Sequence, residues 1–284
     1  MPAAAVLATR SVDSLSDRNF QRLVVFISER AGIKMPPSKR TMLEGRLRRR
    51  LRATGIESLD GYCDFLFKED GLRDEAPYLI NAVTTNKTDF FREPGHFEYL
   101  ERIILPELKT SGRPFIRVWS AACSTGAEPY TIAMMLDDFA VRHGGPDYGI
   151  LATDLDTDVL ETARRGIYPA AMVEPVPDAF LGRYICWPRV RGRNEVRIVP
   201  ALRAAVGFAQ LNLMDSHYPV GVQMDLIFCR NVLIYFDKPT QKAVVSRLCQ
   251  ALRPGGWLLL GHSESIAGFG LPLDAVATTV FKRR

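Results

Sequence analysis

The chain has 284 residues, of which 47% are hydrophobic and 24% charged, as expected for a globular protein large enough for two domains. Its net charge is a modest +5, and no run approaches the roughly 18 apolar residues of a membrane-spanning helix. Five scattered cysteines without a C-x-x-C pair, and four histidines without H-E-x-x-H, argue against a disulfide framework or a metal site. This cysteine usage favours a reducing cytoplasm.

The N-terminal part of the chain is predicted to be helical. Residues 1–10 lack a basic start and a long apolar run, so we expect a disordered tail and not a secretion signal. Residues 11–88 should form a helical domain, whose first helix has an apolar stripe and a glycine stop at Gly32. The stripe consists of Phe20, Leu23, Val24, Ile27 and Ala31.

A second helix, at residues 39–52, carries seven basic residues against one acid, Glu44. Leu43, Leu47 and Leu51 recur at helical spacing and predict its buried face. The density of one sign of charge favours an acidic partner over a merely solvated surface. Nucleic acid is the alternative acidic partner, and this helix alone does not separate the two.

From residue 114 onward, strands alternate with helices, which predicts an α/β domain with a parallel sheet. We expect this domain to span residues 99–284, after a linker at 89–98. Its first strand, at 114–123, leads into a short loop and a helix whose free N–H groups favour an anion. The loop has a single glycine, Gly126, which fits a carboxylate better than a pyrophosphate.

Three acidic residues lie near this predicted site: Glu128 follows the loop, and Asp154 and Asp156 lie at the end of the next strand. Glu128 begins the helix and either caps it or contacts the amino group of a ligand. Asp154 closes a short apolar strand, at the point where an acidic side chain accepts hydrogen bonds from ribose hydroxyls. Asp156 lies nearer to a helix predicted at 157–165, so we assign the N-cap to Asp156 and the ribose to Asp154.

One segment interrupts the alternation of strands and helices. Residues 183–187 and 195–199 flank a basic turn and predict a β-hairpin inserted at about 180–200, whose first strand presents Tyr184 and Trp187. Its edge strand would suit an extended peptide, with the turn arginines facing acidic residues. Covering the sheet edge is the alternative role. The turn arginines are Arg189, Arg191 and Arg193.

Residues 225–236 carry the clearest sign of a site. A buried apolar strand ends there at Arg230 and Asn231, and Tyr235 follows four residues later. In open α/β sheets, ligands bind beyond the carboxyl ends of the strands. A nucleoside with a carboxylate tail and no phosphate fits all these parts together, and S-adenosylmethionine is such a molecule.

Five motifs carry a family resemblance: TNKTDFFRE at 85–93, VWSAACSTGAEPY at 118–130, TDLD at 153–156, CRNVLIYFD at 229–237 and GHSE at 261–264. In these motifs and their order, the chain resembles the chemotaxis receptor glutamate O-methyltransferases, the CheR family. The basic N-terminal helix resembles that of the family as well, so nearly the whole chain is covered.

The resemblance implies a Rossmann-like S-adenosylmethionine-dependent methyltransferase domain joined to a small all-helical domain. The implied reaction forms methyl esters on glutamate side chains of chemoreceptors and releases S-adenosylhomocysteine, with no metal. Catalysis is assigned to Arg92 and Tyr235. The implied cofactor contacts are Asn86, Thr88, Arg92, Glu128, Asp154, Asn212, Leu213, Arg230 and Asn231.

The implied partner is the cytoplasmic helical bundle of a receptor, docked on the basic helix through Arg46, Arg49 and Arg50. A receptor C-terminal peptide at the hairpin is a further expectation; nucleic acid and membrane insertion are not expected. Residues 261–265 depart from the hydrolase pattern G-x-S-x-G at the last position, Ser265. No G-x-G-x-x-G supports an oxidoreductase, whereas a non-enzymatic binding module stays open because a sequence does not show turnover.

Overall fold

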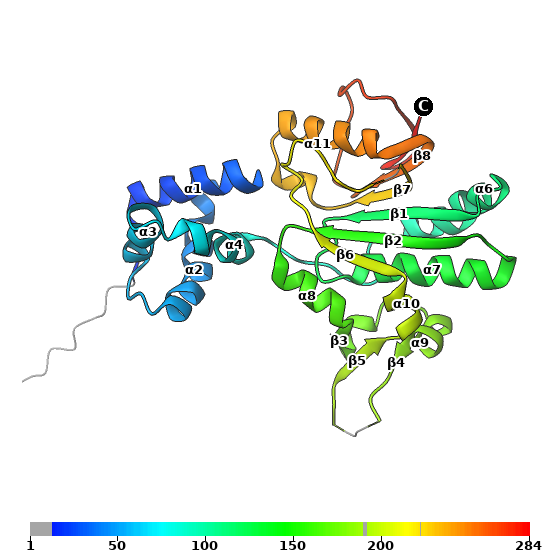
Figure 1. The fold of residues 1–284 in the computed structure, drawn as a ribbon, viewed down its shortest axis with the longest axis horizontal. Coiled ribbons are helices and arrows are strands. Elements are labelled where there is room, and N and C mark those ends of the chain that lie inside the picture. Colours follow the sequence, from blue (N-terminus) through cyan, green and yellow to red (C-terminus); the bar gives the residue numbers. More distant parts are fainter. Residues whose placement is uncertain (1–12, 190–191, 222) are drawn as a thin grey trace, which may run out of the picture. The chain divides into compact units, whose positions relative to one another are not determined.

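The computed structural model describes residues 13–189, 192–221 and 223–284 (Figure 1). The chain divides into a helical unit that ends at Val83 and a larger unit of residues 84–284, with which residues 31–33 are grouped. The expected tail at 1–10 and Arg191 of the hairpin lie outside the described residues. Within the described ranges, no helix is long and apolar enough to cross a membrane.

The first unit is helical, as predicted, and buries the leucine face of its basic helix. Leu43, Leu47 and Leu51 of α2 are all buried. This helix ends at Gly55, whose left-handed φ of 76° lets its N–H reach the carbonyl of Leu51. The helices are α1 (Asp17–Ala31), η1 (Pro37–Lys39), α2 (Arg40–Thr54), α3 (Leu59–Lys68) and α4 (Leu72–Val83). The unit thus ends before the expected boundary at residue 88.

A seven-stranded sheet forms the centre of the second unit, in the order β6-β2-β1-β7-β8-β10-β9. The first five strands of this order are parallel, and β10 runs antiparallel to β8 and β9. The strands are β1 (Phe115–Ala121), β2 (Asp147–Asp154), β6 (Val206–Gln210), β7 (Met224–Cys229), β8 (Leu252–Leu260), β9 (Leu273–Ala277) and β10 (Val280–Arg283). The predicted α/β class is confirmed.

Helices cover both faces of this sheet, with α7 on one face and α11 on the other (Figure 1). Val118 of β1 shares a core with Ile132 of α7, whereas the next residue, Trp119, packs in a core with Val244 of α11. Neighbouring side chains of one strand are therefore buried on opposite faces, which explains why Val118 and Trp119 are both apolar. The helices are α5 (Pro94–Tyr99), η2 (Leu100–Ile104), α6 (Leu105–Thr110), α7 (Ala127–His143), α8 (Thr157–Arg165), η3 (Ala170–Val173), α9 (Asp178–Tyr184), α10 (Pro200–Ala204), η4 (Leu233–Tyr235) and α11 (Lys238–Ala251).

The expected linker at 89–98 is only partly a linker. Helix α5 occupies residues 94–99, and its Phe97 is buried in the core of the α/β unit. Burial of this apolar side chain ties the segment to the sheet, which the motif-based boundary did not anticipate.

The chain builds the sheet outward from β1 in two opposite directions, first through β2 and β6 and then through β7 and β8. The switch point lies between the parallel strands β1 and β7. Ser120 of β1 pairs with Phe228 of β7, and Ala121 pairs with Thr153 of β2. The carboxyl ends of these strands therefore lie at one edge of the sheet, where ligands of such folds bind.

The insert before β6 is a three-stranded sheet of order β3-β5-β4 with α9 leading into it. Strands β4 (Ile185–Cys186) and β5 (Glu195–Ile198) form the predicted antiparallel hairpin, but β5 also pairs with β3 (Ile167–Pro169). The prediction for Tyr184 was wrong, because it ends α9 and is 2% exposed, with its hydroxyl donating to Asp137. Trp187 lies beyond β4 and is 53% exposed.

Candidate functional site

The loop after β1 folds back on the end of β2. Ala122, Ser124 and Gly126 all have positive φ. At Gly126, with φ 91°, an added Cβ would lie 2.8 Å from the Cβ of Ala163, so glycine is required there for space as well as for conformation. The backbone N–H of Ser124 donates to Oδ2 of Asp154 at 2.8 Å, which fixes the loop beside this carboxylate.

Asp154 is 8% exposed, and its two oxygens accept hydrogen bonds from the backbone N–H groups of Ser124 and Asp156. Burial raises the pKa of this carboxyl to about 6, against the lowering effect of these hydrogen bonds. Asp156 accepts from the N–H groups of Asp158 and Val159 and is the N-cap of α8, so the capping prediction is confirmed. The ribose assignment for Asp154 stays a prediction.

Asn86, near the start of the second unit, is hydrogen-bonded both to the loop after β1 and to the N-cap residue Asp156. Its Nδ2 donates to Oδ2 of Asp156 at 2.7 Å, and its carbonyl accepts from Oγ of Ser124 at 2.9 Å. Thr88 lies half-buried on the same segment. The predicted contacts Asn86 and Asp154 are thus both held against one loop.

Glu128 lies between β1 and β7. Its Oε1 accepts from Oγ of Ser120 at 2.8 Å, and its Oε2 accepts from Nη1 of Arg230 at 3.1 Å. Gly126 is the N-cap of α7, so the alternative in which Glu128 caps this helix is wrong. Burial raises the pKa of the Glu128 carboxyl, although the charge of Arg230 opposes that rise.

Arg230 is the centre of a buried ionic cluster. Its side chain is 2% exposed, and its two terminal nitrogens lie 3.1 Å from Glu128 and 3.0 Å from Glu93. Burial disfavours the charge on Glu93, yet hydrogen bonds from Asn231 and Arg230 lower its pKa to about 2. Sequence reasoning missed Glu93 as a site residue, although it ends the motif at 85–93.

Asn231 has a left-handed φ of 58° and is fixed through both its backbone and its side chain. Its N–H donates to Oε2 of Glu264, which also accepts from the N–H of Gly261, and Oε1 of Glu264 accepts from the N–H of Leu233. Glu264 thereby joins the ends of β7 and β8. The motif at 261–264 is a carboxylate anchor and not the serine elbow of a hydrolase.

The loop after β6 contributes Asn212 and Leu213. Oδ1 of Asn212 accepts from the N–H of Met214 at 3.0 Å. Leu213 is buried, and its carbonyl accepts from the hydroxyl of Tyr218 and from Arg247. The loop begins at Leu211, whose N–H donates to the carbonyl of Asp154. Asn212 and Leu213 therefore follow a residue that is hydrogen-bonded to the predicted ribose ligand Asp154.

The two predicted catalytic residues lie on either side of the Arg230 cluster in sequence. Arg92 precedes Glu93, is half-buried, and donates from Nη1 to the carbonyl of Lys87 at 2.8 Å. Tyr235 ends the short helix η4, five residues after Arg230, and is also half-buried. Their catalytic assignment stays a prediction.

A histidine pair adjoins Glu93. Ligand atoms of Glu93, His96 and His262 lie within 4.8 Å of one another, close enough to hold a metal ion. However, the guanidinium of Arg230 already neutralises this carboxylate at 3.0 Å. Burial, together with the charge of Arg230, lowers the pKa of His96 to about 4, so this imidazole is neutral at pH 7. The expectation of no metal stays a prediction.

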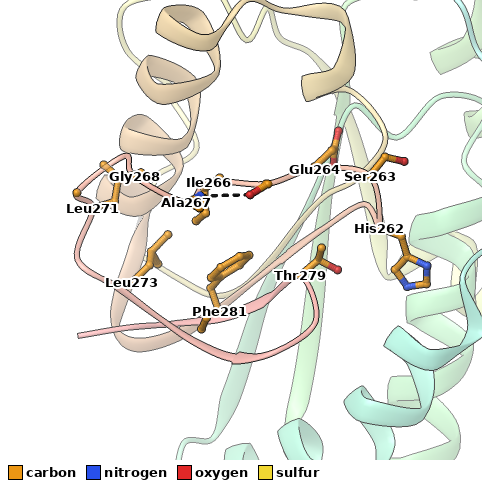
Figure 2. A pocket seen from close by; sticks show the side chains of 13 residues that line it. His262, Ser263, Glu264, Ile266, Ala267, Gly268, Leu271, Leu273, Thr279 and Phe281 are labelled. Atoms are coloured by element: carbon orange, nitrogen blue, oxygen red, sulfur yellow. Dashed lines mark hydrogen bonds between the residues drawn. The ribbon is translucent and has the colours of Figure 1, made fainter.

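A pocket of about 530 Å³ lies beyond His262, between the segment after β8 and the β9–β10 hairpin. Figure 2 shows Leu271, Leu273 and Phe281 at one end of it and His262 with Glu264 toward the other. Because the N–H of His262 lies 3.3 Å from both oxygens of Glu93, the polar end adjoins the ionic cluster.

The three arginines predicted to dock a partner differ in their surroundings. Arg49 is exposed. Arg46 donates to the carbonyl of Val83 at 2.6 Å, and Arg50 forms an ion pair with Glu75 at 2.7 Å. Arg52, which is not one of the three predicted docking residues, is exposed like Arg49. Positive charge alone did not reveal which side chains already have partners within their own unit.

Two family models match the chain. The model described as "CheR methyltransferase, all-alpha domain" covers residues 18–84, and that described as "CheR methyltransferase, SAM binding domain" covers residues 86–281. A chemotaxis protein methyltransferase of Escherichia coli is 42% identical, covering 89% of this chain and 86% of its own. Its Salmonella typhimurium counterpart is 40% identical, covering 94% and 91%. Chemotaxis protein methyltransferase 2 of Pseudomonas aeruginosa is 38% identical, covering 93% and 92%.

Proposed function

This chain belongs to the CheR family of S-adenosylmethionine-dependent methyltransferases, and we propose that it methylates glutamate side chains of chemoreceptors. The observation that carries the proposal is the gathering of Asp154, Glu128 and Arg230 at one edge of the sheet, within the matched cofactor-binding domain.

The groups at this edge fit the chemistry of S-adenosylmethionine. Its ribose hydroxyls and its ammonium group need acceptors, which Asp154 and Glu128 supply. Its carboxylate needs donors, and Nε of Arg230 is buried without a hydrogen-bond partner among the described residues. Glu93 and Glu128 place two carboxylates around one guanidinium, which favours a cationic ligand nearby.

When bound, the cofactor supplies an electrophilic methyl group. A glutamate side chain with an ordinary pKa of about 4.3 is already ionised at pH 7, so the enzyme needs no general base. Its task is to align the carboxylate with the methyl group, and orientation of this kind is worth roughly 7–11 kcal/mol. In this proposal, Arg92 and Tyr235 hold the incoming carboxylate by hydrogen bonds.

The helical unit is proposed to dock the receptor's helical bundle. Support comes from the exposed Arg49 and Arg52 on α2, which would attract an acidic surface at long range. Docking through Arg50 is less favoured, because Glu75 already binds its guanidinium at two points.

A receptor C-terminal peptide at the insert is the finer proposal. Exposed Trp187, Arg189 and Arg193 support it, since they offer an aromatic surface and positive charge. The strand open for addition is the two-residue β4 or the three-residue β3, because β5 is central. Calorimetry with receptor C-terminal peptides tests this, and no heat up to millimolar peptide would leave the insert a purely structural role.

The main experiment measures transfer of labelled methyl groups from S-adenosylmethionine to a receptor cytoplasmic fragment. Base-labile label on glutamate is the expected result, together with calorimetric binding of S-adenosylhomocysteine. Binding without any transfer would indicate a non-enzymatic binding module. A salt-sensitive shift of duplex DNA or RNA would support the nucleic-acid alternative instead.

A further inference from the structure

Glu93 is the residue at which three separate segments of the site meet. Its Oε1 accepts from Nδ2 of Asn231 at 2.9 Å, and its Oε2 accepts from Nη2 of Arg230 at 3.0 Å. The backbone N–H of His262 lies 3.3 Å from both oxygens. One carboxylate therefore joins the segment before α5 to the ends of β7 and β8.

Arg230 holds the segment before α5 at a second point. The same Nη2 that binds Glu93 also donates to the backbone carbonyl of Arg92. Phe91 and Glu93, on either side of Arg92, have left-handed φ values of 53° and 58°. Non-glycine residues keep such conformations only where the surrounding structure fixes them. The backbone around Arg92 is therefore held in place by these contacts, because the residues on either side of it adopt conformations that they do not prefer.

The chemistry of Glu93 points to geometry and not to proton transfer. Its pKa of about 2 keeps it ionised at every pH near neutrality, so it is no general acid or base. Both of its oxygens already have partners from the protein, and its side chain is only 13% exposed. Glu93 supplies a fixed negative charge between Arg92, the predicted catalytic residue, and the predicted cofactor contacts Arg230 and Asn231.

We propose that Glu93 is a positioning residue that ties the segment carrying Arg92 to Arg230 and Asn231, so that the catalytic side chain and the cofactor share one geometry. This rests on the proposed function, because it takes Arg92 to act in methyl transfer and Arg230 and Asn231 to bind the cofactor.

The first test uses the full chain with Glu93→Gln, which keeps the side-chain volume and one acceptor oxygen but removes the charge opposite Arg230. Glu98→Gln is the matched control, since Glu98 is exposed on α5. We expect Glu93→Gln to weaken S-adenosylhomocysteine binding by about tenfold or more, the effect of losing a charge-assisted hydrogen bond. Amide exchange at residues 85–93 should become faster in the complex, while the control matches the wild type in both measurements.

The second test is a double-mutant cycle on turnover with saturating cofactor. If Glu93 acts by positioning Arg92, Glu93→Gln should slow the wild type by about tenfold or more but slow Arg92→Ala by only about two- to threefold. If the rate loss of the double variant equals the product of the two single-variant losses, the proposal is overturned, because the two residues then act independently. Melting temperatures of all variants verify that each is folded.

The two readouts separate this inference from the proposed function. If Arg92→Ala methylates at the wild-type rate, the catalytic assignment fails, and cofactor affinity with amide exchange then decides the role of Glu93. Wild-type affinity and wild-type exchange in folded Glu93→Gln would overturn the positioning role, even if methyl transfer itself is demonstrated.

Discussion

Arg50 and Glu75 form a two-point ion pair inside the helical unit, with Nε 3.1 Å from Oε2 and Nη2 2.7 Å from Oε1. The hydroxyl of Tyr62 donates to the same carboxylate at 2.8 Å. The basic helix α2 thus contains an arginine engaged within its own unit beside exposed ones such as Arg49 and Arg52. The two kinds should respond differently to substitution.

Charge reversal at Arg50 should lower the free energy of unfolding by about 2–3 kcal/mol, because a mostly buried carboxylate would lose its partner and meet another anion. Arg49→Glu with Arg52→Glu should leave stability within about 0.5 kcal/mol of the wild type. Urea unfolding measures both.

The same Arg49→Glu, Arg52→Glu variant should methylate the receptor fragment more slowly, with unchanged affinity for S-adenosylhomocysteine. The wild-type advantage should shrink as salt rises, since exposed charges are screened over about 8 Å at physiological ionic strength. Methylation by this variant at the wild-type rate and at all salt concentrations would leave α2 as solvated surface.

Asp154→Ala should weaken cofactor binding by about 1.5–3 kcal/mol, through loss of an ionised acceptor for ribose hydroxyls. The substitution also unpairs the N–H groups of Ser124 and Asp156, so the melting temperature without ligand should fall as well. Calorimetry gives the affinity separately from the stability. An unchanged dissociation constant would restrict Asp154 to fixing the loop after β1.

Cofactor affinity should depend on pH through Asp154. Its pKa of about 6 in the folded protein lies above the ordinary value of 3.8. This group therefore contributes stability that is fully present below about pH 4 and is lost as pH rises through 6. Conversely, the ionised form accepts better, so S-adenosylhomocysteine binding should weaken as pH falls below 6. Asp154→Asn should remove this fall in affinity below pH 6. If the variant keeps the fall, another titrating group causes it.

Tyr235→Phe and Arg92→Ala should each lower kcat by about 10- to 100-fold while changing cofactor affinity by less than about threefold. The reason is their proposed contact with the reacting carboxylate and not with the adenosine. Single-turnover rates with saturating cofactor are the relevant measurement. Equal losses in affinity and rate would add Tyr235 to the cofactor contacts and leave Arg92 as a cofactor contact alone.

Removal of metal ions should not affect methylation. Both oxygens of Glu93 already accept hydrogen bonds, one from Arg230 and one from Asn231, so this carboxylate is poorly placed to bind a metal ion together with His96 and His262. Activity after dialysis against a chelator should equal that of untreated enzyme. Loss of activity that added zinc restores would identify these three residues as a metal site.

Local signals predicted much of the fold. Helix α8 spans the predicted residues 157–165, and Asp156 caps its start as predicted. The structure adds Gly166, which ends the helix at a left-handed φ. The apolar run before Arg230 predicts a strand covered on both faces, and every residue of β7 is buried.

The remaining features depend on contacts that sequence spacing does not encode. Strand β3 has three residues and becomes a strand only by pairing with β5, some thirty positions later. Glu93 follows an arginine in an irregular segment, and nothing local indicates that its carboxylate meets Arg230, which lies 137 residues away. Arg50 has the same appearance in the sequence as Arg49, yet only its partner Glu75 explains its role.

Glu264 binds the N–H groups at the ends of β7 and β8 before the chain enters the segment toward β9. The proposed cofactor-binding edge is therefore fixed before the chain reaches residues 266–272, although Ile266 and Leu271 pack against the core and Phe269 is buried. Five residues of this segment line the pocket of Figure 2, so substitutions there should reshape the pocket: Ile266, Ala267, Gly268, Gly270 and Leu271. The N–H groups of Asn231, Leu233 and Gly261 should keep their positions in such variants, because Glu264 binds them independently of the pocket lining.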